Sequence, residues 1–242
     1  MIGNSHLAAI MHGWRLAAPD YPNVELIFFG APGPKMRGLE VRGQSLVPKS
    51  KRLSKQIQTT GPAKEISGDY DFFMLCALGF GPTHLDRLYH EYRAESFAKD
   101  RRTPISDECF ARSLHGYLSD TVAIKLFDKL RMITNATIVL IPQPFPAPEQ
   151  ELTEGSDPVG EKCAVALYED ACARLSAQKG ILVTLQPECT KHGALRTKEI
   201  YSRGAMGIRW GFSREIPDED RLHMNGDYGS IVVREALGKL FG

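Results

Sequence analysis

The chain lacks an excess of charge of either sign. Its 242 residues include 30 lysines and arginines against 29 aspartates and glutamates, for a formal net charge of +1. Such a balance provides no bulk attraction to nucleic acid or to an anionic membrane. The most basic stretch, residues 49–55, is short and has no aromatic residue, and we interpret it as a solvated loop or helix face. We therefore expect neither nucleic acid nor a membrane as a partner.

Long apolar runs and paired cysteines are also missing. No run approaches the length of a transmembrane helix, and no signal peptide is recognisable. The five cysteines are odd in number and show no Cys-x-x-Cys spacing: Cys76, Cys109, Cys163, Cys172 and Cys189. We expect reduced thiols in a cytoplasmic protein rather than disulfides or a zinc site.

Fingerprints of cofactor binding are absent too. The sequence contains neither a Gly-x-x-x-x-Gly-Lys-Ser/Thr loop nor a Gly-x-Gly-x-x-Gly turn, and no His/Asp/Glu cluster suggests a metal site. We therefore expect no cofactor and no metal.

What the sequence does contain is an alternation of apolar runs and amphipathic segments. Buried strands are expected at 24–29, 71–78, 136–141 and 180–185, and helices at 5–16, within 106–131, at 160–178 and at 229–241. This alternation predicts a single domain over 1–242 of the α/β class, with three layers and a central parallel sheet. Only Met1 and Ile2 precede Gly3, so we expect a truncated or nearly absent first strand.

Other segments carry weaker patterns. Residues 34–69 are expected to be irregular, with a small hairpin formed by 39–42 and 45–47 around Gly43, and residues 147–159 to form a surface loop.

Candidate catalytic residues lie at the two ends of the chain. A serine hydroxyl needs a nearby imidazole to take its proton, and the imidazole needs a carboxylate to fix its tautomer. Ser5 can supply the hydroxyl, and Asp220-Arg-Leu-His223 supplies the other two groups within one short segment. Asp218 is the reserve carboxylate.

These residues carry a family resemblance. Gly3-Asn4-Ser5-His6 resembles the first block of SGNH (GDSL-type) hydrolases, and Asp220-x-x-His223 resembles their last block, in the same order. The continuation to Gly229 resembles a bacterial subgroup with a Gly-Asn-Ser-His start. The resemblance implies a flavodoxin-like sheet order and a serine esterase that acts on an O-acylated carbohydrate or a small ester. O-acetyl transfer onto a surface glycan and non-catalytic glycan binding remain the alternatives.

Donors for an oxyanion are expected at the strand ends that place Gly30, Gly79 and Gln143 on the same sheet edge as Ser5. The resemblance implies the backbone N–H of Ser5 and a glycine after the second strand, where Gly30 or Gly33 fits. The third donor in the family is an asparagine in a Gly-x-Asn block, but here Gly79-Phe80-Gly81 has glycine in that place. Asn4, His84 or Gln143 could substitute for it.

Structural interpretations compete with these roles. Ser5 could be a helix N-cap, Asp220 could cap a turn, His223 could be a surface histidine, and Gly79 and Gly81 could simply form a tight turn. His6 could point into a helix or into the pocket.

Two further sets complete the expectations. Arg203, Arg209 and Trp210 are candidates for binding a sugar or a carboxylate, whereas His12 and His115 are expected to be structural. The sequence carries no signal for an oligomeric state.

Overall fold

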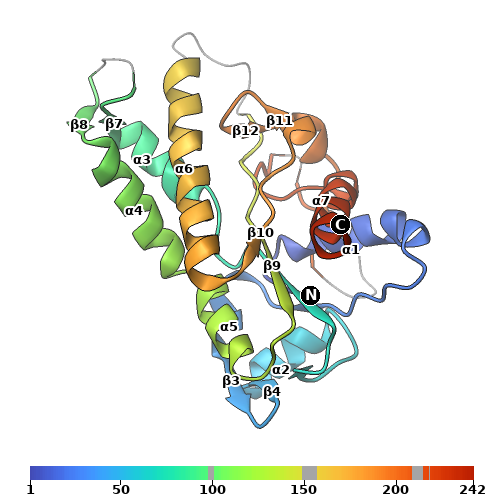
Figure 1. Cartoon of the computed structure of the whole chain (residues 1–242). Helices are drawn as coiled ribbons and strands as arrows, with labels where there is room; N and C mark the ends of the chain where they lie inside the picture. The colour runs from blue at the N-terminus through green and yellow to red at the C-terminus, as the bar shows by residue number, and fades with distance from the viewer. Residues whose placement is uncertain (98–100, 149–156, 209–214, 218) are drawn as a thin grey trace.

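A five-stranded parallel sheet forms the centre of the computed structural model, which describes residues 1–97, 101–148, 157–208, 215–217 and 219–242 (Figure 1). The strands lie in the order β10-β9-β6-β1-β2, and all four neighbouring pairs are parallel. Their bounds are β1 Ile2–Gly3, β2 Phe29–Gly30, β6 Phe72–Cys76, β9 Thr137–Ile141 and β10 Leu182–Val183. Read from β2, this is the flavodoxin-like order 2-1-3-4-5, in which sites lie beyond the carboxyl ends of the strands. The predicted α/β class and the parallel sheet are confirmed.

Helices cover both faces of this sheet. Alternate residues of β6 and β9 enter two separate apolar clusters: Phe73, Leu75, Ile138 and Leu140 on one face, and Met74, Cys76, Val139 and Ile141 on the other. The first face packs against α2–α6 and the second against α1 and α7, which lie together on the right of Figure 1. Strands buried on both faces read as continuous apolar runs, and for this reason β6 and β9 could be predicted.

The described helices and remaining strands have the following bounds. The helices are α1 Leu7–Ala17, α2 Lys51–Gln58, α3 Thr83–Glu91, α4 Asp107–Ser119, α5 Val122–Arg131, α6 Pro158–Lys179 and α7 Gly226–Phe241. The small strands are β3 Leu39–Arg42, β4 Ser45–Pro48, β5 Ile66–Ser67, β7 Tyr92–Ala94, β8 Thr103–Ile105, β11 Lys191–His192 and β12 Arg196–Thr197.

The first strand is very short but occupies the centre of the sheet. β1 has two residues and pairs with both β2 and β6. Its length also explains why the predicted strand at 24–29 is wrong in extent. Because β1 offers two residues for pairing, β2 is confined to Phe29–Gly30 and residues 24–28 have no strand structure.

Residues 34–69 are more regular than expected. The predicted hairpin is confirmed as antiparallel β3 and β4, which turn through Gly43 with φ of +58°. The same region also contains α2, which the sequence analysis missed because this helix buries only Leu53 and Ile57. Its exposed basic residues make the 49–55 stretch a solvated helix face.

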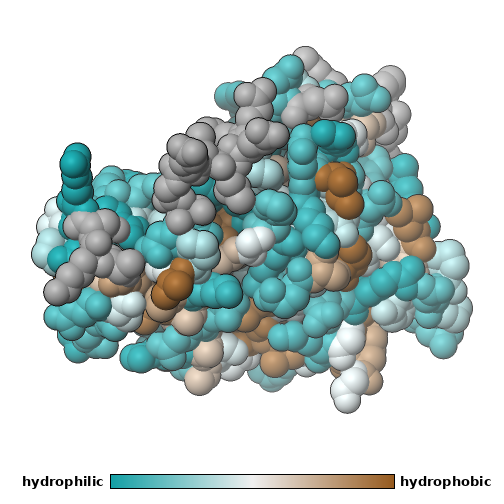
Figure 2. All heavy atoms as spheres, turned by 90° about the horizontal axis from the view of Figure 1, so that it is seen from above, coloured by the Kyte–Doolittle hydropathy of each residue, from teal (hydrophilic) through white to brown (hydrophobic). Residues whose placement is uncertain are grey.

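No described helix combines the length and the apolar character needed to cross a bilayer. Seen from above, the surface is mainly hydrophilic, with apolar residues in separate small areas (Figure 2).

Helices α1 and α7 cross with almost no space between their backbones. A Cβ on Gly229 would lie 1.8 Å from the carbonyl oxygen of Ala9, and a Cβ on Gly13 would lie 2.1 Å from the backbone nitrogen of Ser230. Only glycine fits at both positions without moving a helix. The crossing brings the beginnings of the two helices, which are far apart in the sequence, to the same place.

Replacing Gly229 by alanine should lower the free energy of unfolding by roughly 1–3 kcal/mol, because the helices must separate to accept the methyl group. Gly238→Ala is the matched control in the same helix, since its Cβ would meet nothing within 4 Å. That change should raise the free energy of unfolding by about 0.5–1 kcal/mol. Urea denaturation of both variants measures the two effects, and equal losses would contradict the close crossing.

Candidate active site

Ser5 lies in the turn that joins the end of β1 to the beginning of α1. The Oδ1 of Asn4 accepts the backbone N–H of His6 at 3.1 Å, and the carbonyl oxygens of Asn4 and Ser5 accept the N–H groups of Leu7 and Ala8 at 3.0 and 3.2 Å. The N-cap position belongs to His6, not to Ser5. The Ser5 hydroxyl is therefore not used as a helix cap.

The structure brings Ser5 and His223 together across 218 residues of sequence. The Ser5 Oγ lies 3.0 Å from Nε2 of His223. The other ring nitrogen, Nδ1, lies 2.8 Å from Oδ2 of Asp220. One hydrogen-bonded chain therefore connects the hydroxyl, the imidazole and the carboxylate. It is completed when Nδ1–H donates to Asp220 and Nε2 accepts from the serine.

Asp220 is fixed by its own loop. Its Oδ1 accepts the backbone N–H groups of Leu222 at 2.8 Å and His223 at 2.9 Å, while Oδ2 faces the ring. Partial burial disfavours the charged carboxylate, but the hydrogen bonds from His223 and Leu222 outweigh it and hold the pKa of Asp220 below its ordinary value. The carboxylate thus caps the turn and also orients the imidazole.

The loop that carries His223 is anchored at both of its ends. On one side, the Arg221 carbonyl accepts the N–H of Ala147 at 2.8 Å, and its guanidinium donates to the Pro148 carbonyl. On the other side, Asn225 caps α7 by accepting the N–H of Tyr228 at 3.1 Å.

Asn225 also reaches a neighbouring segment. Its Nδ2 donates to the carbonyls of Ile200 at 2.9 Å and Arg203 at 3.0 Å, and its N–H donates to Tyr201 at 2.7 Å. This one side chain joins the 3₁₀ turn Glu199–Tyr201 to the start of α7, immediately after His223. An asparagine before a helical pattern is a recognisable N-cap signal, but nothing in the local pattern predicts the three bonds to the neighbouring segment.

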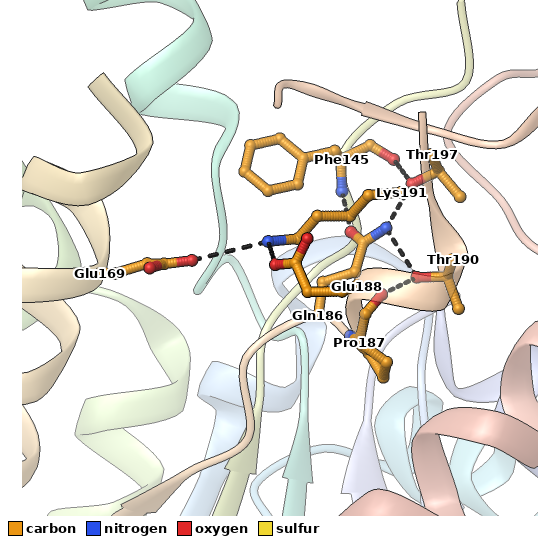
Figure 3. A network of polar contacts seen from close by, with 8 residues as sticks. All are labelled: Phe145, Glu169, Gln186, Pro187, Glu188, Thr190, Lys191 and Thr197. Carbon is orange, nitrogen blue, oxygen red and sulfur yellow. Dashed lines mark hydrogen bonds and ion pairs between the residues drawn. The ribbon is translucent and has the colours of Figure 1, made fainter. Parts of the chain in front are cut away.

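A partly buried network of polar contacts supports the segment after β9 (Figure 3). Gln186 accepts the N–H of Phe145 at 2.8 Å and donates to the hydroxyls of Thr190 at 3.1 Å and Thr197 at 2.9 Å. The Thr197 hydroxyl donates to the Phe145 carbonyl, and the backbone N–H of Thr197 donates to the Pro146 carbonyl at 2.9 Å. The bonds of Thr197 in β12 therefore fix the position of residues 145–147, and Ala147 in turn bonds to Arg221.

Gly30 does not offer a free donor, contrary to the expectation for the oxyanion site. Its N–H donates to the hydroxyl of Thr60 at 2.8 Å, and both residues are buried. A Cβ on Gly30 would lie 2.5 Å from Cδ1 of Ile208, so a side chain also covers this glycine. The sequence pattern could not reveal the Thr60 contact, because the two residues are 30 positions apart in segments of unrelated type.

The loop after β6 explains why glycine replaces the expected asparagine. A Cβ on Gly81 would lie 2.4 Å from Cβ of Gln143, and the Phe80 carbonyl accepts the Gln143 N–H at 2.7 Å. The loop is pressed against the end of β9, and any side chain at position 81 would displace it. Gly79 has φ of +81°, and a Cβ there would meet nothing within 4 Å. The backbone conformation, and not a lack of space, therefore favours glycine at this position, as expected for a tight turn.

The remaining candidate residues lie in different parts of the structure. Gln143 follows β9 at the predicted edge and is partly exposed. His84 lies on α3 and its contacts are with α4: its ring stacks on Tyr117 at a centroid distance of 4.4 Å, and its Nε2 lies 3.4 Å from the Ser113 hydroxyl. Arg203 forms an ion pair with Glu199 at 2.8 Å. Arg209, Trp210 and Asp218 lie outside the described residues.

Comparisons with known proteins give weak similarities. No family model and no curated protein matches the sequence. Among solved structures, an extracellular lipase from Streptomyces rimosus is similar with a TM-score of 0.47 and 12% identity, over 98% of this chain and 97% of that chain. A possible lipase from Chitinophaga pinensis DSM 2588 is similar with a TM-score of 0.38 and 13% identity, over 99% and 96% of the two chains. The fold assignment above rests on the strand order itself.

The Asp220 carboxylate gives a testable pH dependence. Its pKa is lower in the folded chain than its ordinary value of 3.8, so its stabilising contribution is present above that value and is lost as the pH falls through the folded pKa. Asp220→Asn keeps an oxygen for the two backbone N–H groups but cannot ionise. The difference in free energy of unfolding between wild type and Asp220→Asn should therefore shrink as the pH falls from about 5 to about 2. Urea denaturation over that range measures it, and a constant difference would show that the charge of Asp220 contributes nothing.

Proposed function

We propose that this chain is a serine ester hydrolase of the SGNH type, with Ser5 as nucleophile, His223 as general base and acid, and Asp220 as the group that orients His223. The observation that carries the proposal is the hydrogen-bonded chain from Ser5 Oγ through His223 to Asp220, at 3.0 and 2.8 Å. These distances are those that an activated serine requires. The flavodoxin-like strand order and the order of the two end motifs add support.

The proposed reaction is that of a serine activated by a histidine. Ser5 Oγ attacks the acyl carbonyl carbon while its proton moves to Nε2 of His223. The bond from that carbon to the alcohol oxygen then breaks, and His223 returns the proton to the departing alcohol. Water, deprotonated by His223, attacks the resulting ester of Ser5, and the carboxylic acid leaves with Ser5 restored. Asp220 keeps the proton on Nδ1 throughout and stabilises the transient imidazolium.

The oxyanion requires donors near Ser5. The backbone N–H of Ser5 is our first candidate, because it lies two residues before α1 begins and near the positive end of that helix. The N–H of Gly30 donates to Thr60, so we do not propose it as the second donor. Gln143, which lies beside Gly81 at the end of β9, is our candidate for the side-chain donor.

The substrate class follows from the resemblance: a small ester or an O-acylated carbohydrate. Transfer of an acyl group to a glycan hydroxyl uses the same first half of the reaction, with the hydroxyl in place of water. A glycan-binding protein without catalysis would keep the fold but would not form an ester with Ser5.

Covalent labelling separates an enzyme from a binding protein. A fluorophosphonate probe should modify Ser5, and Ser5→Ala should abolish labelling while the folded state persists. His223→Ala should slow both labelling and ester turnover by several orders of magnitude, since the serine loses its base. Ser96, which is exposed, provides the control: Ser96→Ala should label like wild type. Labelling that persists in Ser5→Ala would place the nucleophile elsewhere.

The oxyanion donor can be tested by a matched pair of variants. Gln143→Ala should lower kcat on an activated ester by about tenfold to a hundredfold with KM nearly unchanged, because the contact forms mainly in the transition state. His84→Ala should leave both constants near their wild-type values, because the His84 ring is held by Ser113 and Tyr117. Steady-state kinetics measures both. An unaltered kcat in Gln143→Ala would leave stabilisation of the oxyanion to backbone donors.

A further inference from the structure

A second histidine lies directly against His223. His6 follows Ser5 in the turn, and its ring is stacked on the ring of His223 with 5.0 Å between centroids and 20° between planes. The bond from its N–H to Asn4 Oδ1 holds its backbone in place. The proposed catalytic imidazole therefore has a flat neighbour on one face.

His6 is neutral where it stands. Its Nδ1 is buried and has no hydrogen-bond partner in the described part of the chain. Burial, followed by the nearby His223, lowers the pKa of His6 to about 3, and the Asp220 carboxylate opposes this only in part. A buried polar atom without a hydrogen-bond partner costs stability, so the Nδ1 of His6 lowers the free energy of unfolding.

The two hydrogen bonds of the His223 ring do not by themselves fix the plane of the ring. Its hydrogen bonds to Asp220 and Ser5 lie at opposite ends of the ring, so they fix the line that joins its nitrogens. Rotation of the ring about that line leaves both nitrogens in place, but it turns the Nε2 lone pair, which lies in the ring plane and off the line, away from Ser5. A parallel ring at stacking distance opposes this rotation.

We propose that His6 is a positioning residue whose neutral ring fixes the plane of His223, so that Nε2 stays directed at Ser5 without a second positive charge beside the imidazolium. This inference rests on the proposed function of Ser5 and His223. It requires the flat shape of His6 and its neutrality, not the chemistry of its nitrogens.

Three substitutions at position 6 test the proposal. His6→Phe keeps a flat neutral ring and should retain kcat within about threefold, with a raised Tm because the unpartnered Nδ1 is gone. His6→Ala removes the stack and should lower kcat by about tenfold to a hundredfold with little change in KM. His6→Leu fills the space without a flat face, so it should give an intermediate kcat even if His6→Ala folds poorly. His115→Ala, on α4, is the control and should match wild type.

A readout independent of turnover completes the test. In the NMR spectrum, the Nδ1–H proton of His223 should be sharp in wild type and His6→Phe and should broaden in His6→Ala, because the ring tilts more freely. Wild-type kcat and an unchanged proton signal in His6→Ala would overturn the proposal, and so would a His6→Phe variant as impaired as His6→Ala. If Ser5 is not labelled in wild type, the proposed function fails, while the NMR comparison still decides whether His6 restrains His223.

Discussion

The close crossing of α1 and α7 is the constraint on which the site depends. Ser5 precedes α1, and His223 precedes α7, so the distance between the hydroxyl and the imidazole is set by how near these two helices can approach. Gly13 and Gly229 allow backbone-to-backbone contact, because a Cβ at either position would lie about 2 Å from the opposing backbone. A larger residue at the crossing would therefore alter the site without touching it. The same constraint explains why a glycine follows the Asp-x-x-His segment at position 229.

The site is also supported from a third direction. The crossing fixes the start of α7, but the loop that carries Asp220 and His223 would still have freedom of its own. Asn225 ties one end of this loop to Ile200 and Arg203, and Ala147 ties the other end through Arg221. Gln186 then ties residues 145–147 to β12. Supporting shells of this kind keep reacting groups within a few tenths of an ångström of a productive geometry.

The sequence predicted best those features whose causes are local. The strands β6 and β9 bury both faces and leave uninterrupted apolar runs. The contact of Ser5 with His223 is not local, and it was predicted from the residue types and the resemblance of the two end motifs. The helix α3 was missed because it is only nine residues long and buries just Leu85, Leu88 and Tyr89. The hydrogen bond from the Gly30 N–H to Thr60 joins residues 30 positions apart, and the contact of Gly81 with Gln143 joins residues 62 positions apart. No local pattern encodes such contacts.

The loop after β6 shows how packing limits the chemistry available at the edge of the sheet. Ala77 and Leu78 have φ of 58° and 55°, a left-handed conformation that costs each residue about 1–2 kcal/mol. Their conformation turns the chain so sharply that Gly81 meets the end of β9, where Gln143 occupies the space a side chain would need. A side-chain amide cannot be presented from position 81 in this arrangement. The side chain at this point of the sheet edge is therefore that of Gln143, two residues after the end of β9.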